Sequence, residues 1–453
     1  MKKQIDHLQN YKWTGLFFFE SCPNWKFNGE LTYEPLKGIK LKCLFLGKLP
    51  KEIKNTDIVL GFIFDFGEIT LIPNWTHDFY GRDLPSSLTQ QTLSFSYCIF
   101  GKHFKSTELS FSTITIKFTN SKLAILGHQN TYTISYLNKE RVIYTEPEYE
   151  ISLRHSGDHQ LITNNFFQNI ENLDDEESKK RINVKFKDLM ASEKCGHFTR
   201  VSNLEYLVAF KLSTPCGLKK LRGTINNFLL FISLLSLKYQ NWKSITLSEG
   251  YKSQKFQALF WKPITHKVYN TLKNEDPHRS SYPLSLSDLS NTEESLKTWK
   301  NFKQKEPNFL IDYFFSYLSF DASYYERYIF LLSTIEQVIY ETTGTVTNYM
   351  KEFINHYCSD EAKEMIKREL DIKNDDDIPR NLKSIRNQLV HSVASSRLTP
   401  IALNFVKMNN ILSALTSGLL VYFYRKHGFS LEKVSQFSKN YTNYLPTYYE
   451  SNI

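Results

Sequence analysis

The hydrophobic periodicity of this 453-residue chain changes along its length, and this change restricts the folds open to it. In about the first 140 residues, short runs alternate apolar and polar residues or are rich in aromatics, and Gly, Pro, Asn and Asp separate them, which is typical of strands joined by turns. In about the last 150 residues, apolar residues instead recur at helical spacing. The strand-like runs are Thr14–Phe19, Gly38–Gly47, Ile58–Phe64, Glu68–Ile72, Leu93–Phe100 and Ser112–Phe118. We predict an α+β multidomain protein, in which an antiparallel β-rich N-terminal domain, a sandwich or an open barrel with an α+β extension, precedes an all-α bundle.

The middle of the chain has a mixed pattern. Strand-like runs at Ile182–Met190, Tyr206–Ser213 and Ser244–Ser248 flank an amphipathic helix, Leu218–Leu237, that Thr214 and Pro215 can start. The polar segment Asp276–Glu294 predicts a loop. We expect one domain over residues 1–298, with a sub-boundary near 140–170, and a second over residues 305–453.

Several long helices are predicted in the second domain. Along Tyr324–Thr342, Tyr328, Leu331, Leu332, Ile335, Val338 and Ile339 share one face. The other expected helices are Phe309–Phe320, Thr345–Cys358, Asp360–Leu370, one that begins near Pro379, and Ile401–His427, which Gly428 ends. Four to six helices with short connections predict a bundle.

The net charge of +9 lies almost entirely in the N-terminal part. Residues 305–453 contain 16 Lys and Arg against 17 Asp and Glu, so residues 1–304 carry the excess of positive charge. Such a surface attracts nucleic acid at long range, but it is also compatible with an ordinary solvated surface.

Apolar runs and cysteines indicate the compartment. No apolar run reaches the roughly 18 residues of a membrane helix, and the basic N-terminus lacks the apolar core of a secretory signal. The six cysteines are far apart, which predicts reduced thiols, and Cys195-Gly196-His197 is expected to be structural. We expect a cytoplasmic protein without membrane contact, cofactor or metal.

The segment Ile378–Val393 has the most distinctive helical pattern. Leu382, Ile385, Leu389, Val390 and Val393 form one apolar stripe, and Arg386 lies within it, where a guanidinium needs an anion or a partner surface. Asn387 and His391 lie on the polar side of the same helix. On an ideal helix, His391 points about 140° away from Arg386. One compact site that uses both Arg386 and His391 is more easily built from two crossing helices, which favours a dimer.

The Arg-x-x-x-x-His spacing alone is weak. The same spacing occurs at Arg154 and His159, which we expect in an exposed loop that follows a strand. The C-terminal pattern is more specific, because it combines the helix, an arginine set in an apolar stripe, the adjacent Asn387 and a second long amphipathic helix upstream.

These residues carry a resemblance. Arg386-Asn387-x-x-x-His391 resembles the signature of the HEPN ribonucleases, and Phe330–Glu341 resembles the helix that opens that domain. The segment Phe27–Gly47, followed by the strand pair GFIFDFGEITLI, is similar to the N-terminal domain of the ApeA family of anti-phage HEPN proteins.

The resemblance implies an endoribonuclease that needs no metal. The ribose 2′-OH attacks the phosphate, His391 transfers protons near neutral pH, Arg386 stabilises the developing charge and Asn387 holds the phosphate or the imidazole. The products are a 2′,3′-cyclic phosphate and a 5′-OH. The resemblance also assigns Glu336 a supporting role in which it orients Arg386 by a bidentate contact; its alternative is a carboxylate at the edge of the helix face.

The ApeA resemblance further implies abortive infection by cleavage of transfer RNA, at the anticodon loop, by a homodimer or higher homo-oligomer that a phage-derived trigger activates. Two alternatives stay open. One is a non-catalytic helical module for dimerisation and RNA binding, and the other is the toxin of a toxin–antitoxin pair.

Overall fold

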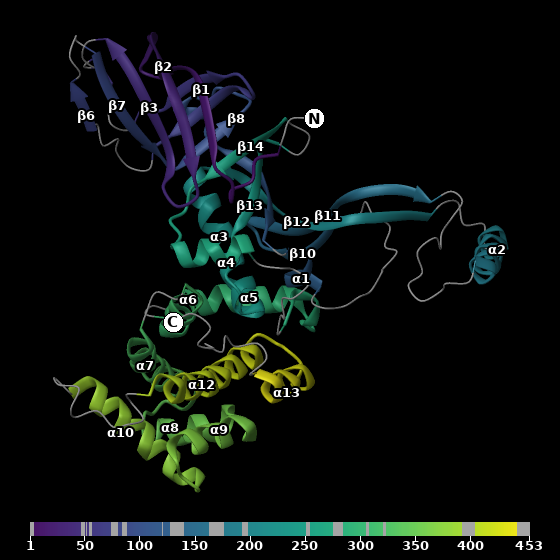
Figure 1. Cartoon of the computed structure of the whole chain (residues 1–453), viewed down its shortest axis with the longest axis vertical. Coiled ribbons are helices and arrows are strands. Elements are labelled where there is room, and N and C mark those ends of the chain that lie inside the picture. The colour runs from purple at the N-terminus through teal and green to yellow at the C-terminus, as the bar shows by residue number, and fades with distance from the viewer. Residues whose placement is uncertain are drawn as a thin grey trace.

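The computed structural model consists of a β-rich part and a helical part that lie end to end (Figure 1). It describes residues 4–441 except for 47–49, 51, 54–56, 74–79, 84–87, 120, 127–139, 163–175, 193–197, 251–253, 275–283, 305–307, 320–322 and 392–403. The predicted fold class, a β-rich N-terminal part followed by a helical part, is confirmed. No helix in the described part of the chain combines the length and apolar character that crossing a membrane requires.

A single antiparallel sheet holds all the named strands. Its order is β10-β11-β12-β9-β13-β14-β8-β5-β4-β1-β2-β3-β7-β6. The strands are β1 (Tyr11–Phe19), β2 (Cys22–Glu34), β3 (Gly38–Leu46), β4 (Val59–Ile63), β5 (Gly67–Ile72), β6 (Tyr80–Asp83), β7 (Leu88–Phe95), β8 (Tyr97–Phe100), β9 (Phe111–Phe118), β10 (Arg141–Thr145), β11 (Tyr149–Ile162), β12 (Phe198–Cys216), β13 (Trp242–Ser248) and β14 (Lys255–Phe260).

The N-terminal half of this sheet is curled like an open barrel. Strands β7 and β8 are joined through Ser96 alone, yet five strands separate them in the sheet order, so the sheet must bend back on itself. Ser96 already lies between the two neighbours of β8, because its N–H donates to the carbonyl of Ile72 in β5 at 3.0 Å and its carbonyl accepts from the N–H of Trp261, which follows β14, at 2.9 Å. The interior is filled with alternate side chains of the strands, such as Phe17 and Leu31, both fully buried.

The N-terminal segment closes one end of this curled sheet. His7 is buried, its Nε2 accepts the Phe260 N–H at 3.0 Å, and its Nδ1 lies 3.2 Å from the Lys243 carbonyl. The Tyr33 hydroxyl donates to the His7 carbonyl at 2.8 Å. These contacts tie the start of the chain to β2, β13 and β14.

The other half of the sheet carries helices on one face. Helix α3 (Leu218–Ser236) packs with its Phe228 ring edge-on against Phe118 and Phe210 of the sheet. The strands β11 and β12 project from the body as a long pair, with α2 (Glu176–Ser192) beyond their far end (Figure 1). The remaining short elements of this part are η1 (Ser106–Glu108), α1 (Ser121–Leu126), α4 (His266–Asn274) and η2 (Leu286–Asp288).

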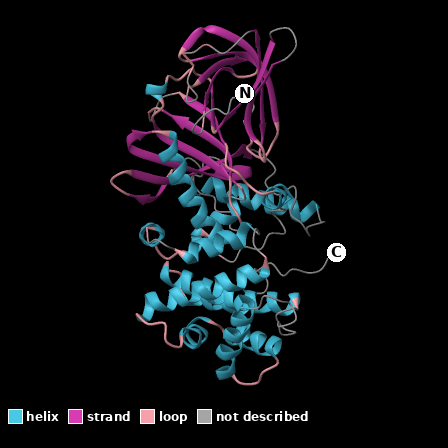
Figure 2. Cartoon of the chain, turned by 90° about the vertical axis from the view of Figure 1, so that its left-hand side faces the viewer, coloured by secondary structure: helices cyan, strands magenta, loops and turns pink. Residues whose placement is uncertain are grey.

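The C-terminal part is a bundle of α-helices, as predicted (Figure 2). The helices are α5 (Thr292–Lys303), α6 (Phe309–Ser319), α7 (Tyr324–Thr343), α8 (Tyr349–Tyr357), α9 (Asp360–Leu370), α10 (Ile378–His391), α12 (Phe405–Lys426) and α13 (Leu431–Asn440), with η3 (Asp375–Asp377) before α10. All six residues predicted to share one face of α7 are buried. Helix α13 was not predicted from the sequence.

Three predictions for the middle of the chain are wrong. Ile182–Met190 belongs to helix α2, because the residues before it are strong helix formers and its apolar spacing also fits a helical period. Thr214 and Pro215 end strand β12, and Gly217 caps α3 instead. Within Asp276–Glu294, α5 already begins at Thr292, since the Asn291 side chain accepts the Glu294 N–H at 3.1 Å.

The buried core is continuous between the sheet and the bundle. On α5, the Trp299 ring lies 5.5 Å from Phe231 of α3 and 6.1 Å from Phe423 of α12. The Trp299 indole N–H also donates to the Asn227 carbonyl at 3.1 Å. Helix α5, at the boundary of the two predicted domains, therefore connects the sheet with the bundle.

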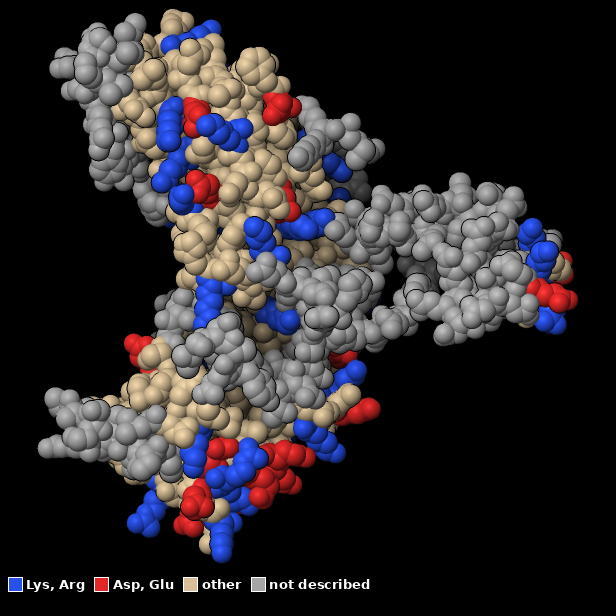
Figure 3. All heavy atoms as spheres, in the orientation of Figure 1, with Lys and Arg blue, Asp and Glu red and all other residues tan. Residues whose placement is uncertain are grey.

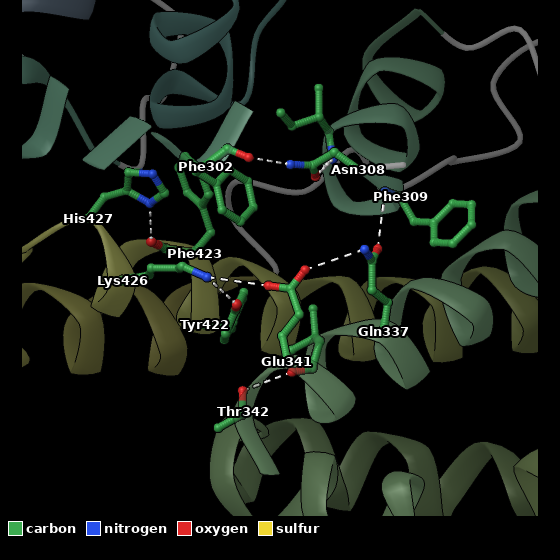
Figure 4. Close-up of polar contacts among 12 residues, drawn as sticks. Phe302, Asn308, Phe309, Gln337, Glu341, Thr342, Tyr422, Phe423, Lys426 and His427 are labelled. Atoms are coloured by element: carbon green, nitrogen blue, oxygen red, sulfur yellow. Dashed lines mark hydrogen bonds and ion pairs between the residues drawn. The ribbon is translucent and has the colours of Figure 1, made fainter. Parts of the chain in front are cut away.

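A polar network continues from this connection into α7 (Figure 4). Lys426 lies over the Phe302 ring at 4.8 Å and its Nζ is 3.5 Å from the Glu341 carboxylate. Gln337 donates to Glu341 at 3.3 Å and accepts the Phe309 N–H at 3.1 Å. The ends of α5 and α6 are thus held against α7 and α12.

Candidate functional site

Helix α10 is fixed at its start by ion pairs with two neighbouring helices. Asp375–Asp377 form η3 directly before it. Lys351 of α8 lies 2.8 Å from Asp376, and Lys367 of α9 lies 2.9 Å from Asp375. These carboxylates lie at the positive end of the helix dipole of α10 and also connect η3 to the bundle. The lower end of the bundle shows charges of both signs on its surface (Figure 3).

The apolar stripe of α10 is largely confirmed. Ile378, Leu382 and Ile385 are buried, and Leu389 packs at the edge of the core. Val390, however, is 50% exposed and lies outside the stripe, because on an ideal helix it points about 80° away from Leu382. Val393 lies outside the described residues.

A buried hydrogen bond holds α10 against α7. The Tyr328 hydroxyl donates to the Leu382 carbonyl at 2.9 Å. Helix α7 itself begins at a capping box of Ser323 and Glu326 and ends at Gly344, which has a φ of 73°. The position of α10 relative to α7 is thus defined one turn before Arg386.

Arg386 is half-buried, as its place in the apolar stripe predicts. Its Nε is buried and has no hydrogen-bond partner among the described residues. The Tyr349 side chain of α8 is close by, and the Arg386 side chain lowers the pKa of Tyr349 both by its charge and by a hydrogen bond. The Nε of Arg386 is therefore the buried group at this position that the described protein groups leave unsatisfied.

Charges from two other helices act on Tyr349. Burial raises the pKa of Tyr349, the Arg386 charge lowers it and the Glu336 charge raises it. Lys383, one turn before Arg386, places its Nζ 4.9 Å from the centre of the Tyr349 ring. Helices α7, α8 and α10 therefore bring Glu336, Tyr349 and Arg386 into one electrostatic environment.

The contact expected between Glu336 and Arg386 is not formed. Both side chains are half-buried, and no ion pair joins them in the described part of the chain. Asn387 is exposed on the polar side of α10. His391 is the last residue of α10, and its side chain lies outside the described residues.

Tyr349 and Lys383 were not predicted as site residues. Neither belongs to a motif, because Tyr349 is 37 positions from Arg386 and meets it only when α8 packs on α10. Lys383 could have been found from its position one turn before Arg386 on the same helix.

The second Arg-x-x-x-x-His pair lies on a strand and not in a loop, and its arginine has a structural partner. Strand β11 continues through Arg154 and His159, with only a bulge between Ser156 and Asp158. The Arg154 guanidinium contacts both carboxylate oxygens of Glu140 at 3.1 Å. The loop prediction is wrong because the chain passes the bulge at Gly157 and continues to pair with β12 as far as Ile162.

Neither the cysteines nor clusters of possible metal ligands form a second candidate site in the described part of the chain. The five described cysteines are free thiols, as predicted, and Cys195 and His197 lie outside the described residues. Within the residues that the structure describes, no group of three or more His, Cys, Asp or Glu side chains could hold a metal ion.

Comparison with protein families gave one match, to the model of ApeA N-terminal domain 1, over residues 12–299. Comparisons with curated proteins and with solved structures gave no match. The matched residues span the whole sheet from β1 to β14 and helices α1–α4, and end in α5. Because the family model covers more than half of the chain, this protein belongs to the family defined by ApeA N-terminal domain 1.

Proposed function

We propose that this protein is an endoribonuclease of anti-phage defence whose active site includes Arg386, Asn387 and His391 of α10. Membership of the ApeA N-terminal domain family supports the role in defence. The observation that carries the nuclease proposal is Arg386, a half-buried cation with an unpartnered Nε and no ion pair to Glu336. A cation kept in this state is suited to an anion that arrives from outside the fold.

A phosphodiester of RNA is the anion that this set of side chains fits. His391 would take the proton of the ribose 2′-OH, the oxygen would attack the adjacent phosphorus, and a proton would pass to the departing 5′-oxygen. Arg386 would stabilise the negative charge that develops on the phosphate, and Asn387 would hold the phosphate or the imidazole by hydrogen bonds. The products would be a 2′,3′-cyclic phosphate and a 5′-OH end, without a metal ion.

We further propose that the active unit is a homodimer and that transfer RNA is the substrate, cut in the anticodon loop in the cytoplasm of infected cells. The divergence of about 140° between Arg386 and His391 on one helix supports a site shared by two copies of α10. The substrate and a phage-derived trigger follow from the HEPN and ApeA resemblance. Glu336 would then support the site through its charge near Tyr349 and Arg386.

Cleavage of total transfer RNA in EDTA, with and without phage lysate, tests this proposal. We expect the wild type to produce new 5′-OH ends and His391→Ala and Arg386→Ala to lose at least about 100-fold of the rate. The matched controls are His356→Ala on α8 and Arg380→Ala on α10, both of which replace exposed residues. Equal cleavage by wild type and His391→Ala would contradict the assignment of the site.

A non-catalytic dimerisation and RNA-binding module is the second candidate. The 50% exposed Val390, next to Asn387 and His391, favours an interface at this end of α10. In that case RNA would bind but no cleavage would occur with or without lysate, and His391→Ala would reduce affinity alone. Gel-shift and cleavage assays on the same samples separate the two candidates.

A further inference from the structure

A row of exposed apolar side chains crosses the outer face of the curled sheet. The strand register places Leu16 of β1 between Phe62 of β4 and Asn28 of β2, and Asn28 lies opposite Leu44 of β3. Leu16, Leu44 and Phe62 are 42%, 49% and 54% exposed. Their sequence neighbours, such as Phe17, are buried inside the curled sheet, so the row points outward. Four adjacent strands contribute to it, over a length of about 14 Å.

Lysines lie on both sides of this row. Lys26 precedes Asn28 by two residues on β2, and Lys42 precedes Leu44 by two residues on β3. Because β2 and β3 are antiparallel, the two lysines lie on the same face but on opposite sides of the row. Both are exposed, and neither forms an ion pair within the residues that the structure describes.

The carboxylates nearest to the row already have partners. Glu30 lies opposite Lys42 in the register, but its carboxylate pairs with Lys12 at 2.7 Å. At the β5 end of the row, the carboxylate of Glu68 accepts the His103 N–H at 3.3 Å. Lys26 and Lys42 are therefore left for acidic groups that come from another molecule.

We propose that this surface, made of Leu16, Leu44, Phe62, Lys26 and Lys42, is the docking site for an acidic amphipathic helix of a partner protein. An apolar centre with charged groups around it is the usual composition of a protein interface. One turn of a helix rises about 5.4 Å, close to the roughly 4.8 Å between strands, so apolar residues that recur once per turn can meet successive strands. Asp and Glu on both sides of that apolar stripe would then reach the two lysines.

Single-stranded RNA fits the same surface less well. Its bases need aromatic rings on which to stack, and within the row Phe62 has a ring whereas Leu16 and Leu44 are aliphatic. The carboxylates of Glu30 and Glu68 would also repel phosphates. The surface therefore favours an acidic protein segment over a nucleic acid.

This docking surface is separate from the candidate nuclease site. The strands β1–β4 form the end of the molecule that lies away from α10 (Figure 1). They also lie within residues 12–299, which match the family model. Binding of a partner here goes beyond RNA cleavage and does not depend on it.

A yeast-displayed library of random peptides about 20 residues long, roughly 30 Å as a helix, tests the proposal when it is sorted for binding to the labelled full chain. We expect the enriched peptides to carry a net negative charge and apolar residues three or four positions apart. Fluorescence anisotropy of an enriched peptide, synthesised with a dye, then measures its affinity, which should fall as the salt concentration rises.

Substitutions in the chain locate the bound peptide. Leu16→Glu and Lys42→Glu should each weaken binding at least about tenfold. Replacing the acidic residues of the peptide with Lys should reverse the preference, so that Lys42→Glu binds it better than the wild type does. The matched controls are Leu431→Glu, at a 75% exposed leucine of α13, and Lys297→Glu, at an exposed lysine of α5, and both should bind like the wild type.

Three results would overturn the proposal. The first is enrichment of neutral or basic peptides, and the second is the absence of any peptide whose affinity falls in Leu16→Glu or Lys42→Glu. The third is displacement of the peptide by oligouridylate, with oligouridylate binding that is itself lost in both variants, which would assign the surface to RNA. Because only binding is measured, none of these results bears on the nuclease proposal.

Discussion

At the scale of single residues, Arg386 combines a structural cost with a proposed function. A guanidinium within an apolar stripe loses hydration, and its Nε recovers no hydrogen bond from the described protein groups. Selection for stability alone would favour an apolar side chain at this position. This cost is consistent with the proposed role of Arg386 in binding a phosphate.

We predict that Arg386→Met leaves the free energy of unfolding unchanged or raises it by about 1 kcal/mol, because it removes an unsatisfied buried donor. Urea denaturation of the wild type and the variant measures this difference. Arg380→Met, which changes an exposed residue of the same helix, is the control. A loss of more than about 1 kcal/mol specific to Arg386→Met would indicate a structural role.

We predict that the buried His7 makes the stability of the fold sensitive to acid. Burial lowers its pKa from 6.5 to about 3, and its Nε2 must stay unprotonated to accept the Phe260 N–H. The contribution of neutral His7 is complete above pH 6.5 and is lost as the pH falls from 6.5 towards 3, because only the unfolded chain can bind the proton. One such group lowers the free energy of unfolding by about 2 kcal/mol at pH 5, relative to its value above pH 6.5.

Thermal unfolding of wild type and His7→Asn between pH 7.5 and 5 checks this prediction. The variant should be less stable at pH 7.5 but should lose less stability on acidification. Part of the dependence should remain, since burial also lowers the pKa of His427 to about 4. Parallel pH profiles for the two proteins would show that His7 does not titrate in this way.

At the scale of elements, α10 is held by one buried apolar stripe and one hydrogen bond from α7. The stripe follows from helical periodicity, whereas the bond from Tyr328 to the Leu382 carbonyl depends on how α7 and α10 pack. This bond fixes the turn that carries Arg386. A small change in α7 should therefore alter the candidate site more than it alters overall stability.

We predict that Tyr328→Phe costs about 1 kcal/mol and increases amide hydrogen exchange in α10. Hydrogen–deuterium exchange with mass spectrometry can locate the change. Tyr340→Phe, which removes a hydroxyl from an exposed tyrosine of the same helix, should leave α10 unchanged. Increased exchange throughout the chain instead of in α10 would mean that the bond supports the global fold.

At the scale of the whole molecule, the sheet and the bundle share a hydrophobic core through α5. Phe423 of α12 is fully buried and its ring lies 6.4 Å from Phe231 of α3 and 6.5 Å from Phe314 of α6. A core that crosses the boundary of the two predicted domains couples their stabilities.

We predict that Phe423→Ala destabilises the described fold by about 3–5 kcal/mol and that differential scanning calorimetry shows one transition for both wild type and variant. The single transition should move to lower temperature as a unit. Two transitions, of which only one moves, would show that the sheet and the bundle unfold independently.

The sequence by itself determined the elements whose periodicity is local and unambiguous. Helix α9 has the predicted bounds, α7 buries its predicted face, and Arg386 is half-buried as its position in the stripe requires. The physical reason is that side-chain direction repeats every 3.6 residues in a helix and every two in a strand. Where both periods fitted, as at Ile182–Met190, the sequence could not decide, and the structure shows a helix.

Only the tertiary structure decided which distant residues meet. The bend at Ser96 divides Leu93–Phe100 between two distant strands, and Tyr349 joins Arg386 only because α8 packs against α10. The row of Phe62, Leu16 and Leu44 on the outer face of the curled sheet depends on the register of four strands. Such contacts depend on the simultaneous burial of several faces, which no local pattern specifies, so the candidate residues could be predicted from the sequence while their neighbours could not.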